Sequence, residues 1–150
     1  MPLDEVMRDT TAMGGLAIYL LVTIIFFLLG NTKAAAELII ALALLYAVIA
    51  VIRTIFFRKR PDRQKYSGFF TKIDASSFPS MHAARSAVLA IILAIVFPQN
   101  TIRILLIIAV LGVAYTRVRL KRHYESDVIG GLILGVLVAW LAIKLAPFFI

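Results

Sequence analysis

Both histidines of the 150-residue chain lie at the polar edge of an apolar segment. His123 belongs to the basic stretch Thr116–Asp127, and Asp127 follows it by four residues. If the apolar run that comes next is a helix reaching back to this point, the two side chains lie one turn apart on the same face. A carboxylate so placed can hold one imidazole nitrogen as N–H and leave the other free to attack. His123 is therefore the candidate nucleophile, and Asp127 is its expected orienting partner.

The residues around the second histidine suit a tetrahedral phosphate group. His82 follows Pro79 and Ser80 at the expected start of a helix, where backbone N–H groups such as that of Met81 can bind an anion. His82 itself could protonate the departing oxygen and activate the hydrolytic water. Guanidinium groups would add forked donors to the phosphate. The arginines expected in this role are Arg53, Arg60 and Arg117.

The other charged residues divide into two groups. Arg85 lies inside an apolar segment, where a functional role is the default interpretation. The loop cations are interpreted as ordinary charges that flank a membrane span; they are Arg58, Lys59, Lys121 and Arg122. The chain has no cysteine, and its scattered carboxylates show no ligand spacing, so neither a metal nor another cofactor is expected. The arginines would supply the charge stabilisation that magnesium supplies elsewhere.

Hydrophobic residues make up 62% of the chain, which calls for a bilayer as the solvent. The expected fold is an all-α membrane protein, a single domain over residues 1–150. It is a bundle of about five transmembrane helices, preceded by a short interfacial segment at Pro2–Asp9 that lacks the basic start of a signal peptide. The expected spans are Thr11–Gly30, Ala36–Phe57, Ser80–Phe97, Thr101–Arg117 and Asp127–Phe149. Arg58–Phe78 is expected to be a polar loop.

Connectivity brings the chemical residues together. Antiparallel spans with short loops place alternate helix ends on one side of the membrane. Both histidines and most of the basic residues then meet at one face. The net charge of +8 lies between apolar runs and not on a separate tail, so a membrane surface is favoured over nucleic acid as the partner. Pairs of small residues four apart predict close helix packing; they are Gly131 with Gly135 and Ala83 with Ala87.

Three motifs resemble those of the type 2 phosphatidic acid phosphatases, the membrane branch of the superfamily shared with vanadium haloperoxidases and glucose-6-phosphatase. The family motifs are Lys-x6-Arg-Pro, Pro-Ser-Gly-His and Ser-Arg-x5-His-x3-Asp. They correspond here to Arg53-x6-Arg60-Pro61, Pro79-Ser80-Met81-His82 and Thr116-Arg117-x5-His123-x3-Asp127. The resemblance covers roughly Arg53 to Asp127, and it implies the same nucleophile, orienting carboxylate, general acid and phosphate-binding residues as the reasoning above.

The chain departs from the family pattern at three motif positions. Arg53 replaces Lys, which keeps the charge but changes reach and donor geometry. Thr116 replaces Ser and keeps the hydroxyl. Met81 replaces Gly, and a backbone with positive φ would strain Met there, whereas a helical N-terminus would tolerate it.

The resemblance implies an integral-membrane lipid phosphatase that works through a phosphohistidine without metal. Its substrate would be a lipid phosphate of the phosphatidate, phosphatidylglycerol phosphate or polyprenyl (di)phosphate type. The alternatives are a lipid phosphotransferase on the same scaffold and a non-catalytic membrane protein that binds anionic lipid. The expected location is the cell membrane, with the positive-inside rule favouring a cytoplasmic site. Whether copies associate into a homo-oligomer is left open by the sequence.

Overall fold

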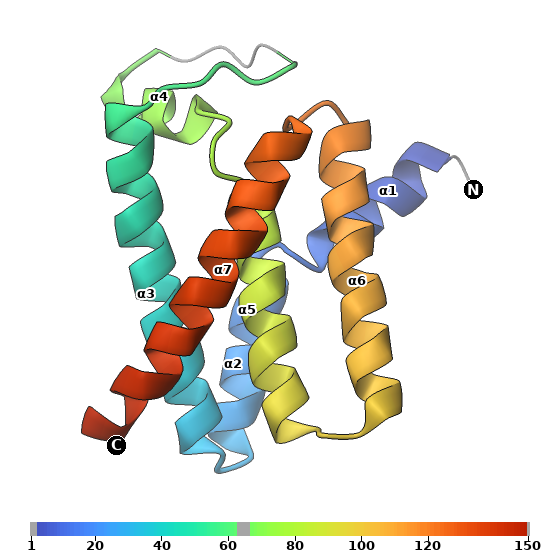
Figure 1. The fold of residues 1–150 in the computed structure, drawn as a ribbon, viewed down its shortest axis with the longest axis vertical. Coiled ribbons are helices and arrows are strands. Elements are labelled where there is room, and N and C mark those ends of the chain that lie inside the picture. Colours follow the sequence, from blue (N-terminus) through green and yellow to red (C-terminus); the bar gives the residue numbers. More distant parts are fainter. Residues whose placement is uncertain (1–2, 63–66, 150) are drawn as a thin grey trace.

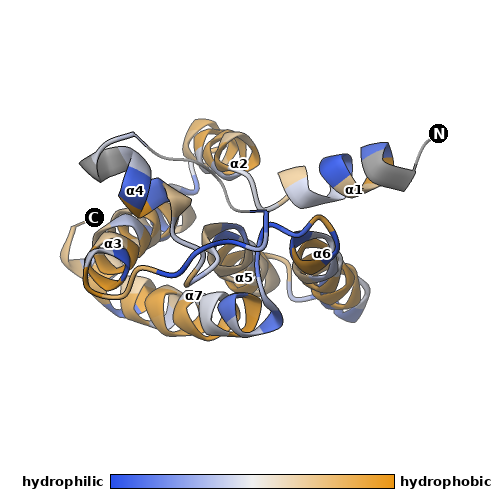
Figure 2. Ribbon diagram, turned by 90° about the horizontal axis from the view of Figure 1, so that it is seen from above, coloured by the Kyte–Doolittle hydropathy of each residue, from blue (hydrophilic) through white to orange (hydrophobic). Residues whose placement is uncertain are grey.

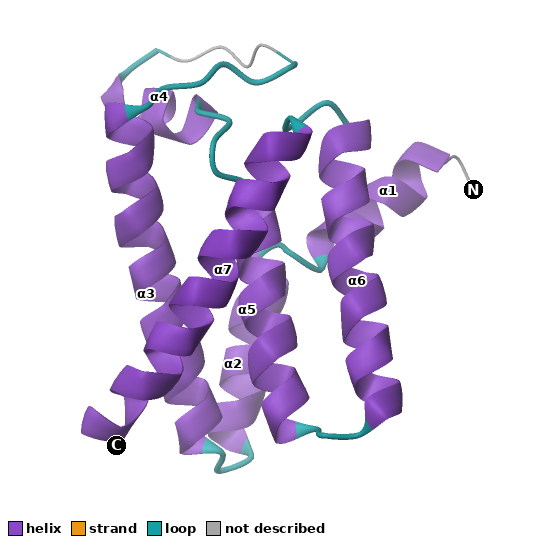
Figure 3. Cartoon of the chain, viewed as in Figure 1, coloured by secondary structure: helices purple, strands orange, loops and turns teal. Residues whose placement is uncertain are grey.

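The protein, described by a computed structural model over residues 3–62 and 67–149, is helical (Figure 1). The helices are α1 Leu3–Ala12, α2 Leu16–Leu28, α3 Thr32–Ile55, α4 Phe69–Ala75, α5 Met81–Val96, α6 Asn100–Arg119 and α7 Glu125–Leu145, with a final 3-10 turn at Ala146–Phe148. The described residues form helices and loops and no strand (Figure 3), and their β-structure is limited to one isolated bridge between Lys59 and Ser76. The expected all-α fold is confirmed.

The helices are built for a bilayer. The helices α3, α6 and α7 are long and apolar enough to cross a membrane, and α1 with α2 makes a fourth candidate if this bent pair is one span. Their outward faces expose large apolar side chains such as Leu28, Leu111 and Trp140. The span expected at Ser80–Phe97 corresponds to α5, which has only 16 residues and lies among the other helices. The expected count of five spans is therefore approximate.

Two expected elements were wrong in detail. The span expected at Thr11–Gly30 is interrupted, because α1 ends at Ala12, α2 begins at Leu16 and the two helices differ in direction by 41°. Gly14 and Gly15 lie in this break, where their lack of a side chain lets the backbone leave the helical path. The loop expected at Arg58–Phe78 also contains the short helix α4.

The predicted close packing is found between α5 and α7, which make the most extensive helix contact in the described bundle. A Cβ atom at Gly131 would lie 2.4 Å from the carbonyl oxygen of Ser80, and one at Gly135 would lie 2.5 Å from that of Ala84. The two glycines therefore let the backbone of α7 approach the backbone at the start of α5. This contact fixes the start of α5 against the first turns of α7.

The ends of α3 and α6 and the starts of α5 and α7 meet at one end of the bundle, as connectivity predicts (Figure 1). The connecting segments at this end are hydrophilic (Figure 2). Several hydrogen bonds tie them together: Ser77 N–H donates to Arg58 O at 2.7 Å and Asp62 N–H donates to Lys121 O at 3.1 Å. The segment before α4 is thereby held across the segment that joins α6 to α7.

Candidate active site

A cavity of about 590 Å³ opens at the polar end of the bundle. Both histidines line it, together with the three arginines expected to bind phosphate, which are Arg53, Arg60 and Arg117. Met81 and Arg85 of α5 line it as well. On α3 the cavity wall continues from Arg53 to Tyr46, seven residues or about 10 Å along the helix axis. The cavity thus joins a cationic end to a wall that includes the apolar residues Ile49 and Ala50.

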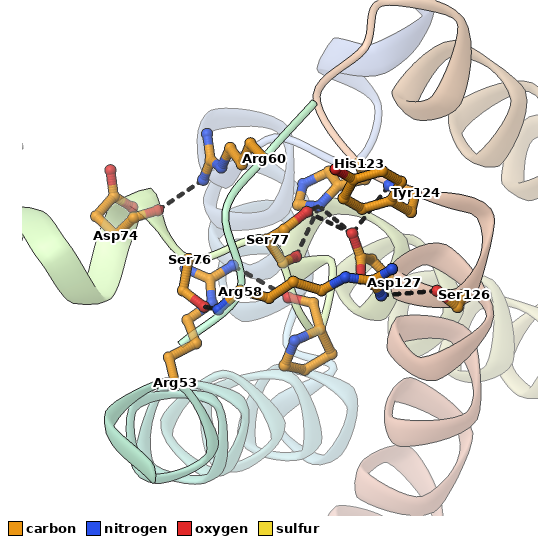
Figure 4. Close-up of polar contacts among 11 residues, drawn as sticks. Arg53, Arg58, Arg60, Asp74, Ser76, Ser77, His123, Tyr124, Ser126 and Asp127 are labelled. Atoms are coloured by element: carbon orange, nitrogen blue, oxygen red, sulfur yellow. Dashed lines mark hydrogen bonds and ion pairs between the residues drawn. The ribbon is translucent and has the colours of Figure 1, made fainter. Parts of the chain in front are cut away.

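His123 lies in the connection between α6 and α7 and is only 2% exposed. Its Nδ1 atom is 2.8 Å from the carbonyl oxygen of Ser77 (Figure 4). A carbonyl oxygen only accepts, so Nδ1 carries the hydrogen and Nε2 keeps its lone pair. Burial, reinforced by the positive charges of Arg117 and Arg60, lowers the pKa of His123 to about 3. The imidazole is therefore neutral at neutral pH, and Nε2 is the nitrogen with a free lone pair.

Asp127 does not hydrogen-bond the imidazole directly. Its Oδ2 atom is 3.9 Å from Nδ1 of His123, which is beyond hydrogen-bond distance. The expected pairing one turn apart fails because α7 begins only at Glu125, so His123 lies outside the helix that carries Asp127. As the third residue of α7, Asp127 instead accepts from the N–H of Tyr124 at 2.9 Å and caps the helix.

Two side chains that the sequence did not single out hold Asp127 in place (Figure 4). The hydroxyl of Ser77 donates to its Oδ2 atom, and Nη1 of Arg58 lies 2.6 Å from its Oδ1 atom. Arg58 also donates to Oγ of Ser126 at 2.8 Å and lies over the ring of Tyr124, 4.3 Å from its centroid. The interpretation of Arg58 as an ordinary flanking charge was therefore wrong. Arg58 stands two residues before Arg60-Pro61, and this closeness to the motif was the feature of the sequence that could have indicated its role.

The arginines of the cavity are partly engaged by carbonyl oxygens. Arg53 donates through Nη2 to Pro79 O at 3.0 Å, and Arg60 donates through Nη2 to Asp74 O at 2.6 Å. Arg117 donates through Nη1 to the hydroxyl of Thr11 at 3.3 Å. The Nε atoms of Arg53 and Arg117 are buried and have no hydrogen-bond acceptor within the described residues. Buried donors of this kind are suited to an anion that enters the cavity.

The start of α5 supplies further donors. Ser80 is the residue before the helix, and its hydroxyl is buried with no partner among the described residues. The first N–H groups of a helix have no acceptor within it, so those of Met81 and His82 are open to a ligand. Met81 is the first residue of α5, and the non-glycine residue with positive φ in the described chain is Lys121. Met81 therefore adopts ordinary helical backbone, and the strain that a positive φ would bring does not arise.

The described parts of the chain contain no candidate metal site. Groups of three or more His, Cys, Asp or Glu side chains that could hold a metal ion are not found there. The residues expected from the sequence to act on phosphate all line the cavity or adjoin it, from four different segments of the chain. What they can do together is bind a phosphate group beside a neutral, oriented imidazole.

The chain is similar in sequence and in fold to known proteins. Over 64 residues, or 43% of the chain, it is 39% identical to the lipid A 4'-phosphatase of Bacteroides thetaiotaomicron, and it covers 28% of the length of that protein. The fold is similar to the crystal structure of LpxE from Aquifex aeolicus, with a TM-score of 0.79 and 21% identity over 96% of this chain and 87% of that chain.

A second solved structure also has a similar fold. It is the transmembrane PAP2 type phosphatidylglycerolphosphate phosphatase from Bacillus subtilis, with a TM-score of 0.67 and 24% identity over 99% of this chain and 79% of that chain. The family model of the PAP2 superfamily matches residues 34–150, which include every motif residue of the cavity. The chain is therefore a multi-pass membrane protein that belongs to the PAP2 superfamily.

Proposed function

We propose that the protein is a membrane lipid phosphatase that hydrolyses a phosphate ester through a phosphohistidine. The observation that carries the proposal is the state of His123, which is neutral, has Nδ1 fixed by the Ser77 carbonyl and lines a cavity of arginines. Membership of the PAP2 superfamily supports it independently. The lipid A 4'-phosphatase and the phosphatidylglycerolphosphate phosphatase to which the chain is similar act on lipid phosphates, as their names state.

In the first step Nε2 of His123 attacks phosphorus, and the bond between phosphorus and the lipid oxygen breaks. The leaving oxygen takes a proton from His82, whose imidazolium the bound phosphate dianion stabilises. Arg53, Arg60 and Arg117, with the hydroxyl of Ser80 and the Met81 N–H, stabilise the charge that builds up on the phosphoryl oxygens. The products of this step are a lipid alcohol and a phosphohistidine.

In the second step water attacks the phosphohistidine. His82, now neutral, takes a proton from the water, the P–N bond breaks, and His123 recovers its lone pair as inorganic phosphate leaves. Asp127 acts on His123 through Ser77. The Asp127 carboxylate accepts a hydrogen bond from the Ser77 hydroxyl, while the Ser77 carbonyl accepts one from Nδ1 of His123. The arginines carry the electrostatic role, so the reaction is proposed to need no metal ion.

The substrate class follows from the two ends of the cavity. A phosphate fits the cationic end, and the wall formed by Tyr46, Ile49 and Ala50 suits an apolar stem that continues toward the bilayer. Phosphatidate, phosphatidylglycerol phosphate and polyprenyl phosphate or diphosphate are all of this type. The membrane is proposed to be the cell membrane, with the cavity facing the cytoplasm.

The test is phosphate release by purified protein in detergent with EDTA present, over a panel of these lipid phosphates and diphosphates. His123→Ala is assayed beside the wild type. EDTA-resistant release that is lost in the variant would support the proposal and rank the substrates. Release that stops with EDTA, or that persists in His123→Ala, would overturn it. An added alcohol that receives the phosphoryl group in place of water would identify the transferase instead.

A further inference from the structure

The break between α1 and α2 reaches the candidate site, although it lies outside residues 34–150 that match the family model. The carbonyl oxygen of Gly14 in this break accepts from Nε of Arg85 at 3.0 Å. Arg85 lies on α5 one turn after His82, is buried and lines the same cavity. A buried guanidinium needs acceptors for its donors, and the interruption of the helix at Gly14 frees a carbonyl to be one.

A second contact joins the last turn of α1, just before the break, to α6. The hydroxyl of Thr11 accepts from Nη1 of Arg117 at 3.3 Å. Arg117 is only 7% exposed, and its Nε atom has no partner among the described residues, so this hydroxyl limits how the guanidinium can turn. The neighbouring Thr10 behaves differently, because its hydroxyl donates to Val6 O of α1 at 2.8 Å.

The backbone of Gly14 is wedged between the two helices. A Cβ atom on this residue would lie 2.6 Å from the carbonyl oxygen of His82 on α5 and 3.0 Å from Cγ1 of Val113 on α6. The break thus contacts α5 and α6, two of the helices that carry charged cavity residues, and the helix α1 itself packs on α6. Figure 1 shows α1 slanting across α6 at the same end of the bundle as the cavity.

Plain helix packing explains the close approach of Gly14 but does not explain the two polar contacts. Packing requires small residues at the contact and no hydroxyl or carbonyl directed at a guanidinium. Here both polar contacts end on arginines of the cavity, one from each helix. Thr11 and Gly14 thus hold Arg117 and Arg85 in defined orientations. In many functional sites, residues behind those that touch the ligand hold the ligand-binding side chains in place in this way.

We propose that Thr11–Gly14, the end of α1 together with the start of the break, is a positioning element for the phosphate site. Thr11 orients Arg117 for the phosphate, and the Gly14 carbonyl, through Arg85, holds the first turn of α5 on which His82 lies. The inference rests on the proposed function, because it gives these arginines and His82 a phosphate to act on. It adds residues to the site from a segment that the family match leaves out.

The decisive variant is Thr11→Val, which removes the hydroxyl and keeps the shape of the side chain. Thr10→Val is the matched control, since its hydroxyl bonds only within α1. Two quantities are measured for each purified protein in detergent: KM and kcat for the best lipid phosphate, and the affinity for inorganic phosphate. We expect Thr11→Val to raise KM and weaken phosphate binding by about three- to tenfold, which corresponds to one hydrogen bond of ordinary strength. We expect Thr10→Val to match the wild type.

Two further readouts separate positioning from general stability. The thermal midpoints of Thr11→Val and Thr10→Val should be equal, and Thr11→Ser should restore phosphate affinity because it restores the hydroxyl. Equal phosphate affinity in the two valine variants, or a failure of Thr11→Ser to recover it, would overturn the inference even with hydrolysis intact. If the wild type hydrolyses no lipid phosphate, the proposed function fails, and the comparison of phosphate affinities still decides whether Thr11 orients Arg117.

Discussion

At the scale of single residues, the backbone carbonyl of Ser77 orients the imidazole of His123, and Asp127 contacts Ser77 and not the imidazole. The Ser77 carbonyl cannot donate, so it fixes the tautomer by itself. The carboxylate of Asp127 is shared among the Ser77 hydroxyl, the Tyr124 N–H and Arg58. It therefore ties the segment before α5, the start of α7 and the segment after α3 to the place where His123 lies.

Arg58 provides the first test at this scale. Arg58→Gln removes the ion pair with Asp127 and should lower kcat by about tenfold, the effect of losing one hydrogen bond between charged groups. KM should change little, since Arg58 does not line the cavity in which phosphate is proposed to bind. The measurement is steady-state hydrolysis in detergent.

The neighbouring Lys59 provides the control. Its side chain is exposed, and in the described structure only its backbone takes part in the bridge to Ser76. Lys59→Gln removes the same charge from the same segment and should leave kcat unchanged. An equal loss in both variants would show that net charge near the site matters and that the contact with Asp127 does not.

A second test at this scale uses pH. The pKa of His123 is lowered from its ordinary 6.5 to about 3 by burial and by Arg117 and Arg60. Between these values the unfolded chain binds a proton that the folded protein excludes, so this residue's contribution to stability is complete above pH 6.5 and is lost as the pH falls toward 3. In the absence of phosphate, the free energy of unfolding should fall more steeply with acidification in the wild type than in His123→Asn.

The comparison removes the titration of other groups, because both proteins share them. The difference in slope should approach about 1.4 kcal/mol per pH unit, the value for one proton. Unfolding in detergent is measured between pH 6.5 and 4. Identical slopes would mean that His123 is accessible to protons in the folded protein and is not held neutral by its surroundings.

At the scale of the elements, the contact of α5 with α7 sets the position of the helix start that is proposed to bind phosphate. Gly131→Ala would place a Cβ atom 2.4 Å from the Ser80 carbonyl oxygen, which belongs to the backbone and cannot turn away. The start of α5 must then shift, taking Ser80 and the Met81 N–H with it. We expect a loss of about 1–3 kcal/mol in stability and at least a tenfold loss in kcat/KM.

Gly68→Ala serves as the control for this variant. Its nearest described neighbour would be the Thr71 hydroxyl at 3.8 Å, an ordinary contact, and α4 does not carry the proposed chemistry. Stability is measured by thermal unfolding in detergent and activity by phosphate release. Normal activity in Gly131→Ala would show that the helices can separate slightly without disturbing the site.

The elements also show what the sequence could predict. The glycine pair of α7 indicated close packing, and the spacing of the three motifs placed their residues at helix ends or in the adjoining connections, on one side of the bundle, as the structure has them. The break after Ala12 was missed because Thr11–Gly30 is charge-free throughout, and hydropathy does not detect a change in helix direction. Arg58 and Ser77 were missed because their partner, Asp127, lies about 50 or more residues away in the sequence and is brought to them only by folding.

At the scale of the whole molecule, the bundle separates charge from apolar surface. The polar end gathers the motif residues and most cations, whereas the opposite end, at the turn before α6, carries few charges. Apolar composition and alternating connectivity were enough to predict this asymmetry. They could not predict the number of spans closely, because α5 is buried by its neighbours and needs less length than a helix that faces lipid alone.

The asymmetry predicts how the molecule is oriented in the membrane, which is proposed to be the cell membrane. Loops rich in lysine and arginine remain on the cytoplasmic side, so the end with the cavity should face the cytoplasm. The chain has no cysteine, which allows single reporters to be introduced. Glu125→Cys places an exposed thiol at the polar end, and Gln99→Cys places one at the opposite end. A membrane-impermeant maleimide added to intact cells should label Gln99→Cys and leave Glu125→Cys unlabelled until the cells are opened.

The two reporters control for each other, because an accessible thiol must react from one side or the other. The reverse pattern would place the cavity on the outer face, and the surplus of cations at that end would then belong to phosphate binding and not to topology. That outcome would also move the substrate, since a site that opens near the membrane surface can reach lipid phosphates only in its own leaflet. The labelling pattern thus decides from which leaflet the lipid phosphates of the activity panel must be drawn.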